Sequence, residues 1–176
     1  MTGVTNLKAR ITGRAQAEAA RYSDGHDRPL RGYVLTLGTY GGVLGGIAGI
    51  VKLTGRPLPA RVQTSDIVLG GAATHKLSRL LAKDPVTSPI RAPFAAYKGQ
   101  QGPAELAEDV RGSGTQHAVG ELLTCPFCMG MWIATGFAAG LIFVPRTTRL
   151  VMSTLTVVAT SDLLQFVYAW LEQAAG

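Results

Sequence analysis

Charged residues are scarce in this chain of 176 residues. Asp, Glu, Lys and Arg together make up 16% of it, whereas an average soluble domain carries about 25%. The chain has two cysteines, which excludes a scaffold held together by several disulfides. Aromatic residues are also few, at 7%, but apolar residues overall reach 47%. This combination of low charge and high apolar content excludes a chain that is mostly intrinsically disordered.

The few charges are unevenly distributed along the chain. Residues 32–51, 122–145 and 150–171 form stretches of 20, 24 and 22 residues, and the one charge within them is Asp162. A helix that crosses the hydrocarbon core of a membrane needs about 20 residues. Buried helices of soluble proteins normally keep a polar face at helical spacing, and these stretches lack one. The three stretches therefore predict membrane-spanning helices.

A fourth stretch, residues 62–82, has a short apolar centre followed by His75, Lys76 and Arg79. Alone it could be an amphipathic helix at the membrane surface. The distribution of Lys and Arg favours a fourth span: residues 1–32 hold six and 76–117 hold six, against three in 52–61 and two in 146–149. The positive-inside rule then places both termini in the cytoplasm. We therefore predict an all-α membrane bundle with four spans, at about 33–52, 62–82, 122–145 and 150–171.

Two segments lie outside these spans. The basic cytoplasmic segment 1–32 precedes the membrane domain 33–176, and its first part predicts either an amphipathic helix on anionic lipid headgroups or a partly disordered tail. Prolines at 85, 89 and 93 in the cytoplasmic loop 84–120 predict an extended strip along the membrane surface. The rest of the loop is predicted to be flexible, apart from a helical turn at 103–111. Aromatics are not interleaved with the basic residues, so we expect no nucleic-acid partner.

Glycines repeat through the first span at spacings of three and four residues, which places them on one face of the helix. In lipid, glycine lets two helices approach closely. This face predicts close contact with a neighbouring helix. The simpler interpretation is that this neighbour is another helix of the same small bundle. The alternative is an interface with a second copy or with another membrane protein. The glycines concerned are Gly38, Gly41, Gly42, Gly45, Gly46 and Gly49.

Cys125 and Cys128 form a Cys-Pro-Phe-Cys motif at the start of the third span. The N-terminus of a helix favours a thiolate, as in redox-active thiols, but no βαβ pattern accompanies the motif and a thioredoxin fold is excluded. A zinc site would need two further ligands, for which His75 and His117 are the candidates within the chain. The third interpretation is structural, with two small apolar residues at a tight helix entry.

Polar residues also fall at membrane depth. A carboxylate in lipid normally has a partner, so we predict that Asp162 pairs with His75, Lys76 or Arg79, either as a tie between helices or as a proton or ion relay. By the same topology, the polar residues of the second and fourth spans and the loop should converge on the cytoplasmic face. This cluster comprises His75, Lys76, Arg79, Asp84, Arg91, Glu121, Cys125, Cys128 and Asp162.

Two blocks of the chain, THKLSRLLAKDPVTSPIRAPF and GELLTCPFCMGMW, resemble the hallmark blocks of domain of unknown function 1360, a family of small bacterial integral membrane proteins. The resemblance covers about residues 66–171, and the glycine-rich span and the basic segment before it look like additions. It implies a bacterial membrane protein without an established activity, and it supports the second span. The matching residues are Leu77, Arg79, Leu80, Asp84, Pro89, Ile90, Arg91, Glu121, Leu122, Leu123, Cys125, Cys128, Gly130 and Trp132.

Taken together, these features predict a multi-pass protein of the bacterial inner membrane that acts as a non-enzymatic scaffold or as a small subunit of a membrane assembly. Its expected partners are the lipid bilayer with its anionic headgroups and either a second copy or another membrane protein. No nucleotide-binding loop, zincin helix or nucleophile elbow is found in the sequence. No cofactor is expected unless Cys125 and Cys128 bind zinc. The alternatives are a thiol-redox or zinc-binding protein using these cysteines, and a small transporter or channel subunit using Asp162.

Overall fold

The structure is a computed structural model that describes residues 2–26 and 28–175, with side chains for residue 10 and from residue 12 onwards. Long helices dominate it, and one short β-hairpin interrupts them. The elements follow in the order α1 (Thr2–Ser23), α2 (Leu30–Thr54), α3 (Thr64–Lys83), η1 (Pro85–Thr87), α4 (Ser88–Arg91), β1 (Ala95–Gly102), β2 (Glu105–Val110), α5 (Gly114–Thr124), α6 (Pro126–Phe143) and α7 (Pro145–Ala175).

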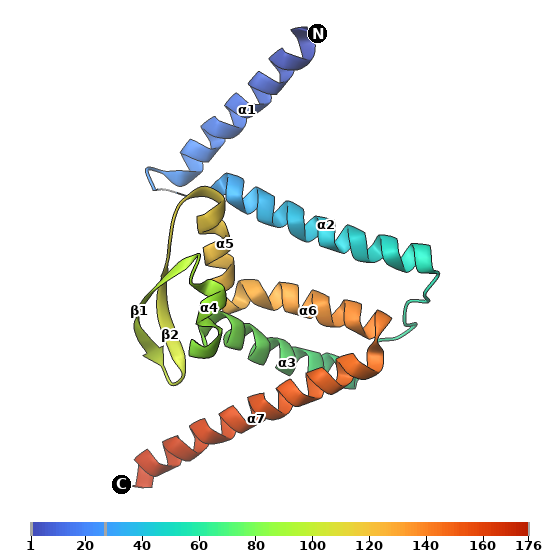
Figure 1. Cartoon of the computed structure of the whole chain (residues 1–176), viewed down its shortest axis with the longest axis vertical. Helices are drawn as coiled ribbons and strands as arrows, with labels where there is room; N and C mark the ends of the chain where they lie inside the picture. Colours follow the sequence, from blue (N-terminus) through green and yellow to red (C-terminus); the bar gives the residue numbers. More distant parts are fainter. Residues whose placement is uncertain (1, 27, 176) are drawn as a thin grey trace.

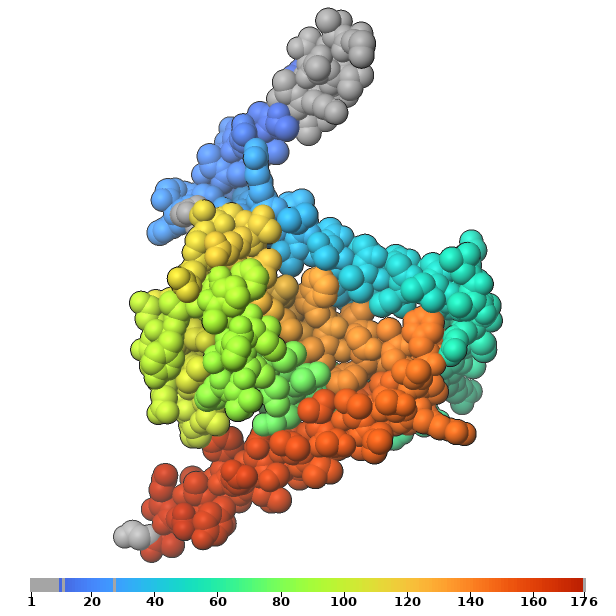
Figure 2. Space-filling model, viewed as in Figure 1, coloured from blue at the N-terminus to red at the C-terminus, as the bar shows by residue number. Residues whose placement is uncertain are grey.

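Four long helices form the body, and consecutive ones run in opposite directions: α2 and α6 one way, α3 and α7 the other (Figure 1). Helix α3 packs against both α6 and α7, whereas α2 contacts mainly α5. The 3₁₀ turn η1, helix α4, the hairpin and α5 cover the end of the body where α2 begins and α3 ends (Figure 1). Helix α1 and the last part of α7 project from the body (Figure 2).

Three helices of the described chain, α2, α6 and α7, are long and apolar enough to cross a membrane. Most of the large apolar side chains of these helices are exposed; Leu37 and Leu44 of α2 and Leu163 of α7 are examples. The buried hydrophobic residues among those described are mainly small, namely Ala73, Ala82, Ala95, Ala118 and Met152. Exposed apolar surface of this extent is typical of a membrane or protein interface and not of a soluble monomer.

Proline and glycine determine where the helices end. Gly55 ends α2 in the left-handed conformation, with φ of 62°, and its N–H donates to the carbonyl of Lys52. Asp84, Cys125 and Val144 each precede a proline, and the residue before a proline disfavours helical backbone. Asp84 and Cys125 are extended, with ψ of 138° and 108°. Val144 lies between α6 and α7 with ψ of 60°, so that α7 folds back along the bundle.

The structure differs from the sequence predictions in the loop 84–120. The strip 84–94 is not extended, because Pro85 and Pro89 both occupy first-turn positions of the short helices η1 and α4, where proline is tolerated. The rest of the loop is neither flexible nor helical at 103–111: it forms the antiparallel hairpin of β1 and β2 and then α5. The fold is therefore mostly helical but not all-α. The predicted helix 122–145 is also divided, since Pro126 separates α5 from α6.

The glycine-rich face of α2 is open. A Cβ atom added at Gly38, Gly41, Gly42, Gly45, Gly46 or Gly49 would meet no other part of the described chain within 4 Å. The simpler sequence-based interpretation is that these glycines pack against another helix of the bundle. In the described chain they make no such contact. The close approach occurs at Gly32 instead, where a Cβ would lie 2.7 Å from the Ala118 Cβ and 2.8 Å from the Gly114 carbonyl oxygen.

Gly32 and Gly45 on the same helix form a matched pair for mutation. Gly32→Ala should destabilise the purified protein by about 1–3 kcal/mol, because α5 must move to admit the new methyl group. Gly45→Ala should be neutral or stabilising by up to about 1 kcal/mol, since alanine favours helix. Thermal unfolding in detergent measures both, and equal effects of the two substitutions would contradict this packing.

Candidate functional site

A pocket of about 520 Å³ lies between α3, α7 and the turn of the hairpin. Five of the predicted cluster residues line it: His75, Lys76 and Arg79 from α3, Asp84 after α3, and Asp162 from α7. Glu105 joins them from the first position of β2. The structure therefore brings these five predicted residues together in one pocket.

Ion pairs connect the walls of this pocket. The Lys76 Nζ atom donates to the Asp162 Oδ2 atom at 2.6 Å, and Lys76 is one of the three partners that the sequence predicts for Asp162. Arg79 donates through its Nη2 atom to Glu105. Asp162 and Arg79 remain accessible, with 38% and 45% of their side chains exposed. The pocket thus combines cationic and anionic groups that are paired but still open to a ligand.

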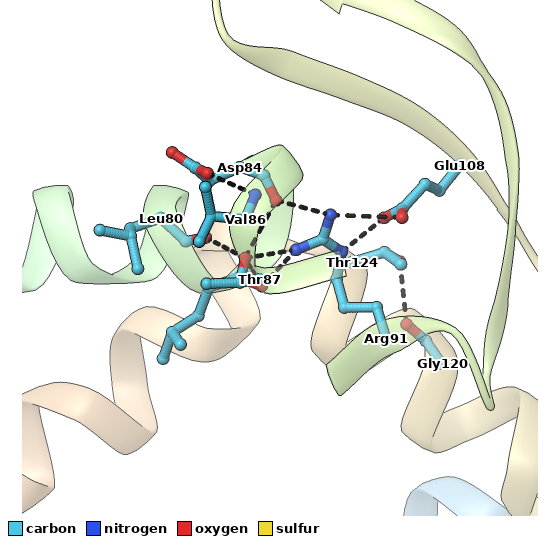
Figure 3. Close-up of polar contacts among 9 residues, drawn as sticks. Leu80, Asp84, Val86, Thr87, Arg91, Glu108, Gly120 and Thr124 are labelled. Carbon is cyan, nitrogen blue, oxygen red and sulfur yellow. Dashed lines mark hydrogen bonds and ion pairs between the residues drawn. The ribbon is translucent and has the colours of Figure 1, made fainter. Parts of the chain in front are cut away.

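Arg91 of the predicted cluster is completely buried, with 0% of its side chain exposed. Figure 3 shows its polar contacts with Glu108, Thr87 and Asp84. Arg91 makes two hydrogen bonds to the carboxylate of Glu108, which is 5% exposed: Nε donates to Oε2 at 2.5 Å and Nη2 to Oε1 at 3.2 Å. Nη1 donates to the Leu81 carbonyl and to the Thr87 hydroxyl, and Nη2 also donates to the Asp84 carbonyl. All five N–H groups of the guanidinium are therefore used.

This arrangement, which we call the arginine clasp (Arg91, Glu108, Thr87 and the carbonyls of Leu81 and Asp84), joins the end of α3, η1, α4 and β2. The Leu81 carbonyl lies in the last turn of α3, where helix carbonyls lack a partner within the helix, and Asp84 directly follows α3. Glu108 belongs to β2, and Arg91 ends α4. The clasp therefore attaches the hairpin to the end of α3 and has a structural role.

Glu121 lies in a separate cluster between α2 and α5. Its carboxylate accepts a hydrogen bond from the hydroxyl of Tyr33 and another from Arg28 at 3.5 Å. The Nε2 atom of His117 lies 3.6 Å from Glu121 Oε1, and the Arg28 guanidinium lies 5.7 Å from the centre of the Tyr33 ring. Glu121 therefore does not line the pocket but connects α5 to the start of α2.

The two cysteines lie at the start of α6 and are not joined by a disulfide. The backbone N–H of Cys128 donates to the Cys125 sulfur at 3.3 Å, which caps the first turn of the helix. Within the part of the chain that the structure describes, no three His, Cys, Asp or Glu side chains are close enough together to hold a metal ion. His75 and His117 therefore do not complete a zinc site with the cysteine pair within one chain.

Sequence reasoning missed three of the partners. Glu105 and Glu108 lie in the segment 103–111, which the sequence predicted to be a helical turn and which is part of the hairpin instead, so neither was a candidate for an ion pair. The third is Asp66, which is buried at the opposite end of α3 and accepts two hydrogen bonds from Arg149, both at 2.8 Å. The sequence does contain a feature that could have pointed to Asp66, because it is an isolated acid at the start of an otherwise uncharged stretch.

Comparisons with known proteins agree with the resemblance of the two blocks. A family model described as "Protein of unknown function (DUF1360)" matches residues 69–168. The chain is also similar to the protein named "Sporulation protein YjcA" of Bacillus subtilis (strain 168), with 28% identity over 111 residues, which cover 61% of this chain and 94% of that protein. No solved structure matches. The family match begins within α3, so α1 and α2 precede it.

The arginine clasp can be tested by removing one partner. Arg91→Met should destabilise the protein by about 3–5 kcal/mol, because it leaves the buried Glu108 carboxylate unpaired. The double variant Arg91→Met/Glu108→Leu should recover part of this loss, since no unpaired charge remains. Thermal unfolding in detergent and protease cleavage within the hairpin measure the effects.

Lys98→Met provides the control for the clasp, because Lys98 pairs with Asp109 on the exposed side of the same hairpin at 3.2 Å. Loss of such an exposed pair should cost only about 0–1 kcal/mol. If Arg91→Met and Lys98→Met had equal effects, the clasp would not hold the hairpin.

Proposed function

We propose, on the premise that the chain belongs to the DUF1360 family, that this protein is a non-enzymatic subunit of a bacterial inner-membrane assembly. In this proposal α2, α3, α6 and α7 cross the membrane. The hairpin and α5 form a cap on the cytoplasmic side. The open glycine-rich face of α2 receives a helix of another subunit, either a second copy or a different membrane protein.

The alternating directions of the four long helices support this topology. The cap lies at the end where α2 begins and α3 ends (Figure 1), so most of the basic segment 76–117 lies at this end, together with Arg28 and Arg31 around the start of α2. The opposite end carries the smaller number of Lys and Arg residues, in 52–61 and 146–149. The positive-inside rule favours a cytoplasmic cap.

The observation that carries the proposal is the open face of α2. Six glycines occupy this face without any neighbour within 4 Å of an added Cβ, and apart from α5 the helix has few contacts with the body. Glycine lowers the intrinsic stability of a helix by about 1 kcal/mol per residue, so a face built from six of them calls for a compensating contact. In lipid the contact that glycine favours is a second helix at close range.

The polar residues support a non-enzymatic role. Arg91 and Glu108 pair with each other in the clasp. Glu121 connects α2 to α5, and the pair of Lys76 and Asp162 connects α3 to α7. The same groups that sequence analysis considered for a relay therefore have a structural use. The name of the Bacillus subtilis relative states a process, sporulation, and no activity.

The assembly can be tested on the glycine face. The full chain extracted in mild detergent should migrate as a complex larger than one copy, and Gly42→Leu/Gly46→Leu should dissociate it, because leucine holds the partner helix away. Light scattering combined with size-exclusion chromatography measures the mass of the protein component.

Ala134→Leu/Ala138→Leu is the matched control, since these two residues have the same spacing on the exposed side of α6. The complex should survive this change. A wild-type protein that runs as a single copy without a partner, or a complex that both double variants dissociate equally, would refute the role of the α2 face.

The topology is tested by labelling cysteines in intact cells with a maleimide that does not cross membranes. Cys128, which is exposed in the structure, should react only after the cells are permeabilised. In a variant without native cysteines, Leu58→Cys should react in intact cells, because Leu58 is 65% exposed in the loop between α2 and α3. The reverse pattern would show that the cap faces outside.

A further inference from the structure

The pocket between α3, α7 and the hairpin turn carries groups of both charges. Lys76 and Arg79 are cationic, and Asp84, Glu105 and Asp162 are anionic. We propose that this pocket binds the headgroup of a zwitterionic phospholipid with a primary ammonium group, as in phosphatidylethanolamine. This goes beyond the role of the α2 face and does not depend on it, although it rests on the proposed membrane crossing of α7.

The paired charges favour a zwitterion over a simple ion. A phosphate alone would face three carboxylates, and an ammonium alone would face a lysine and an arginine. A ligand that carries both charges can contact both sides of each ion pair at once. Its phosphate would accept from Arg79, which donates through Nη2 alone within the described chain and has further N–H groups to offer.

The chemistry of the anionic side selects the kind of ammonium group. A primary ammonium has three N–H donors for carboxylate oxygens, which Glu105 and Asp162 can supply. A quaternary ammonium such as choline has no N–H donor and is bound by cages of several aromatic rings. Among the described residues that line the pocket, Phe166 is the one aromatic, so a choline headgroup does not fit.

The position of the pocket indicates a lipid and not a free metabolite. Asp162 lies 12 residues after the start of the predicted span at residue 150, which is about 18 Å along a helix and therefore inside a hydrocarbon core of about 30 Å. An ion pair with 38% of the Asp162 side chain exposed is costly at that depth unless a polar group covers it. Leu163 and Phe166 beside it are 62% and 59% exposed, which offers an apolar surface to an acyl chain.

The test measures lipid retention by the full chain in detergent with native mass spectrometry. Phosphatidylethanolamine, phosphatidylglycerol and phosphatidylcholine with identical acyl chains are added separately. The ethanolamine lipid should bind about tenfold more tightly than the other two, which is the effect of one charge-assisted hydrogen bond. Glu105→Gln should remove this preference. Asp109→Asn, on the exposed side of the same strand, is the control and should leave it intact.

A second variant keeps the proposal testable if single changes disturb folding. Glu105→Gln/Asp162→Asn leaves Lys76 and Arg79 without partners, so it should prefer the anionic phosphatidylglycerol, a gain that an unfolded protein would not show. Equal retention of all three lipids by the wild type would overturn the proposal, and so would a preference for phosphatidylglycerol. Glycerophosphoethanolamine, the headgroup without acyl chains, should bind much more weakly, and equal binding would assign the pocket to a soluble ligand instead.

Discussion

The buried ion pair between Arg91 and Glu108 is the interaction on which the cap of η1, α4, the hairpin and α5 depends. A two-stranded hairpin is marginally stable alone, and the last four residues of β1 are all glycine or glutamine, which gives it little intrinsic strand preference. Arg91 holds this hairpin by the carboxylate of Glu108 and at the same time satisfies the Leu81 and Asp84 carbonyls at the end of α3. One side chain thus ends a helix, orients a hairpin and closes one end of the bundle.

Helix α3 is the second element on which the arrangement depends, and this explains why it carries several charged residues. It is the least apolar of the four long helices, yet it lies between α6 and α7. Its charged residues are paired at three levels: Asp66 with Arg149 at one end, Lys76 with Asp162 further along, and Arg79 with Glu105 at the cap. The first two pairs connect α3 to α7 and the third connects it to the hairpin, so its polar residues hold neighbouring elements together.

The long helices were predictable because absence of charge over the width of a membrane is a local property of the sequence. The partner of Asp162 was predictable for the same reason, since a single acid among apolar residues needs a base at its own level. The cap was not. Its proline strip becomes short helices and its glycine-rich strand becomes a hairpin because of contacts such as Arg91 to Glu108, which join residues 17 positions apart. Local preference at 84–110 is weak, so tertiary contacts decide.

The attachment of α2 differs in kind from that of the other long helices. It is fixed near its ends, by Tyr33 to Glu121 and by Arg56 to the Phe143 carbonyl at 2.7 Å, and in between by the edge-to-face contact of Tyr40 with Trp132. No ion pair of the described chain crosses its middle, where the glycines lie. The family match begins after this helix, and the ion pairs of α3 with α7 and with the hairpin form without it. In the assembly proposed above, a helix that is held at few points and open along one face is suited to connect this chain to a partner.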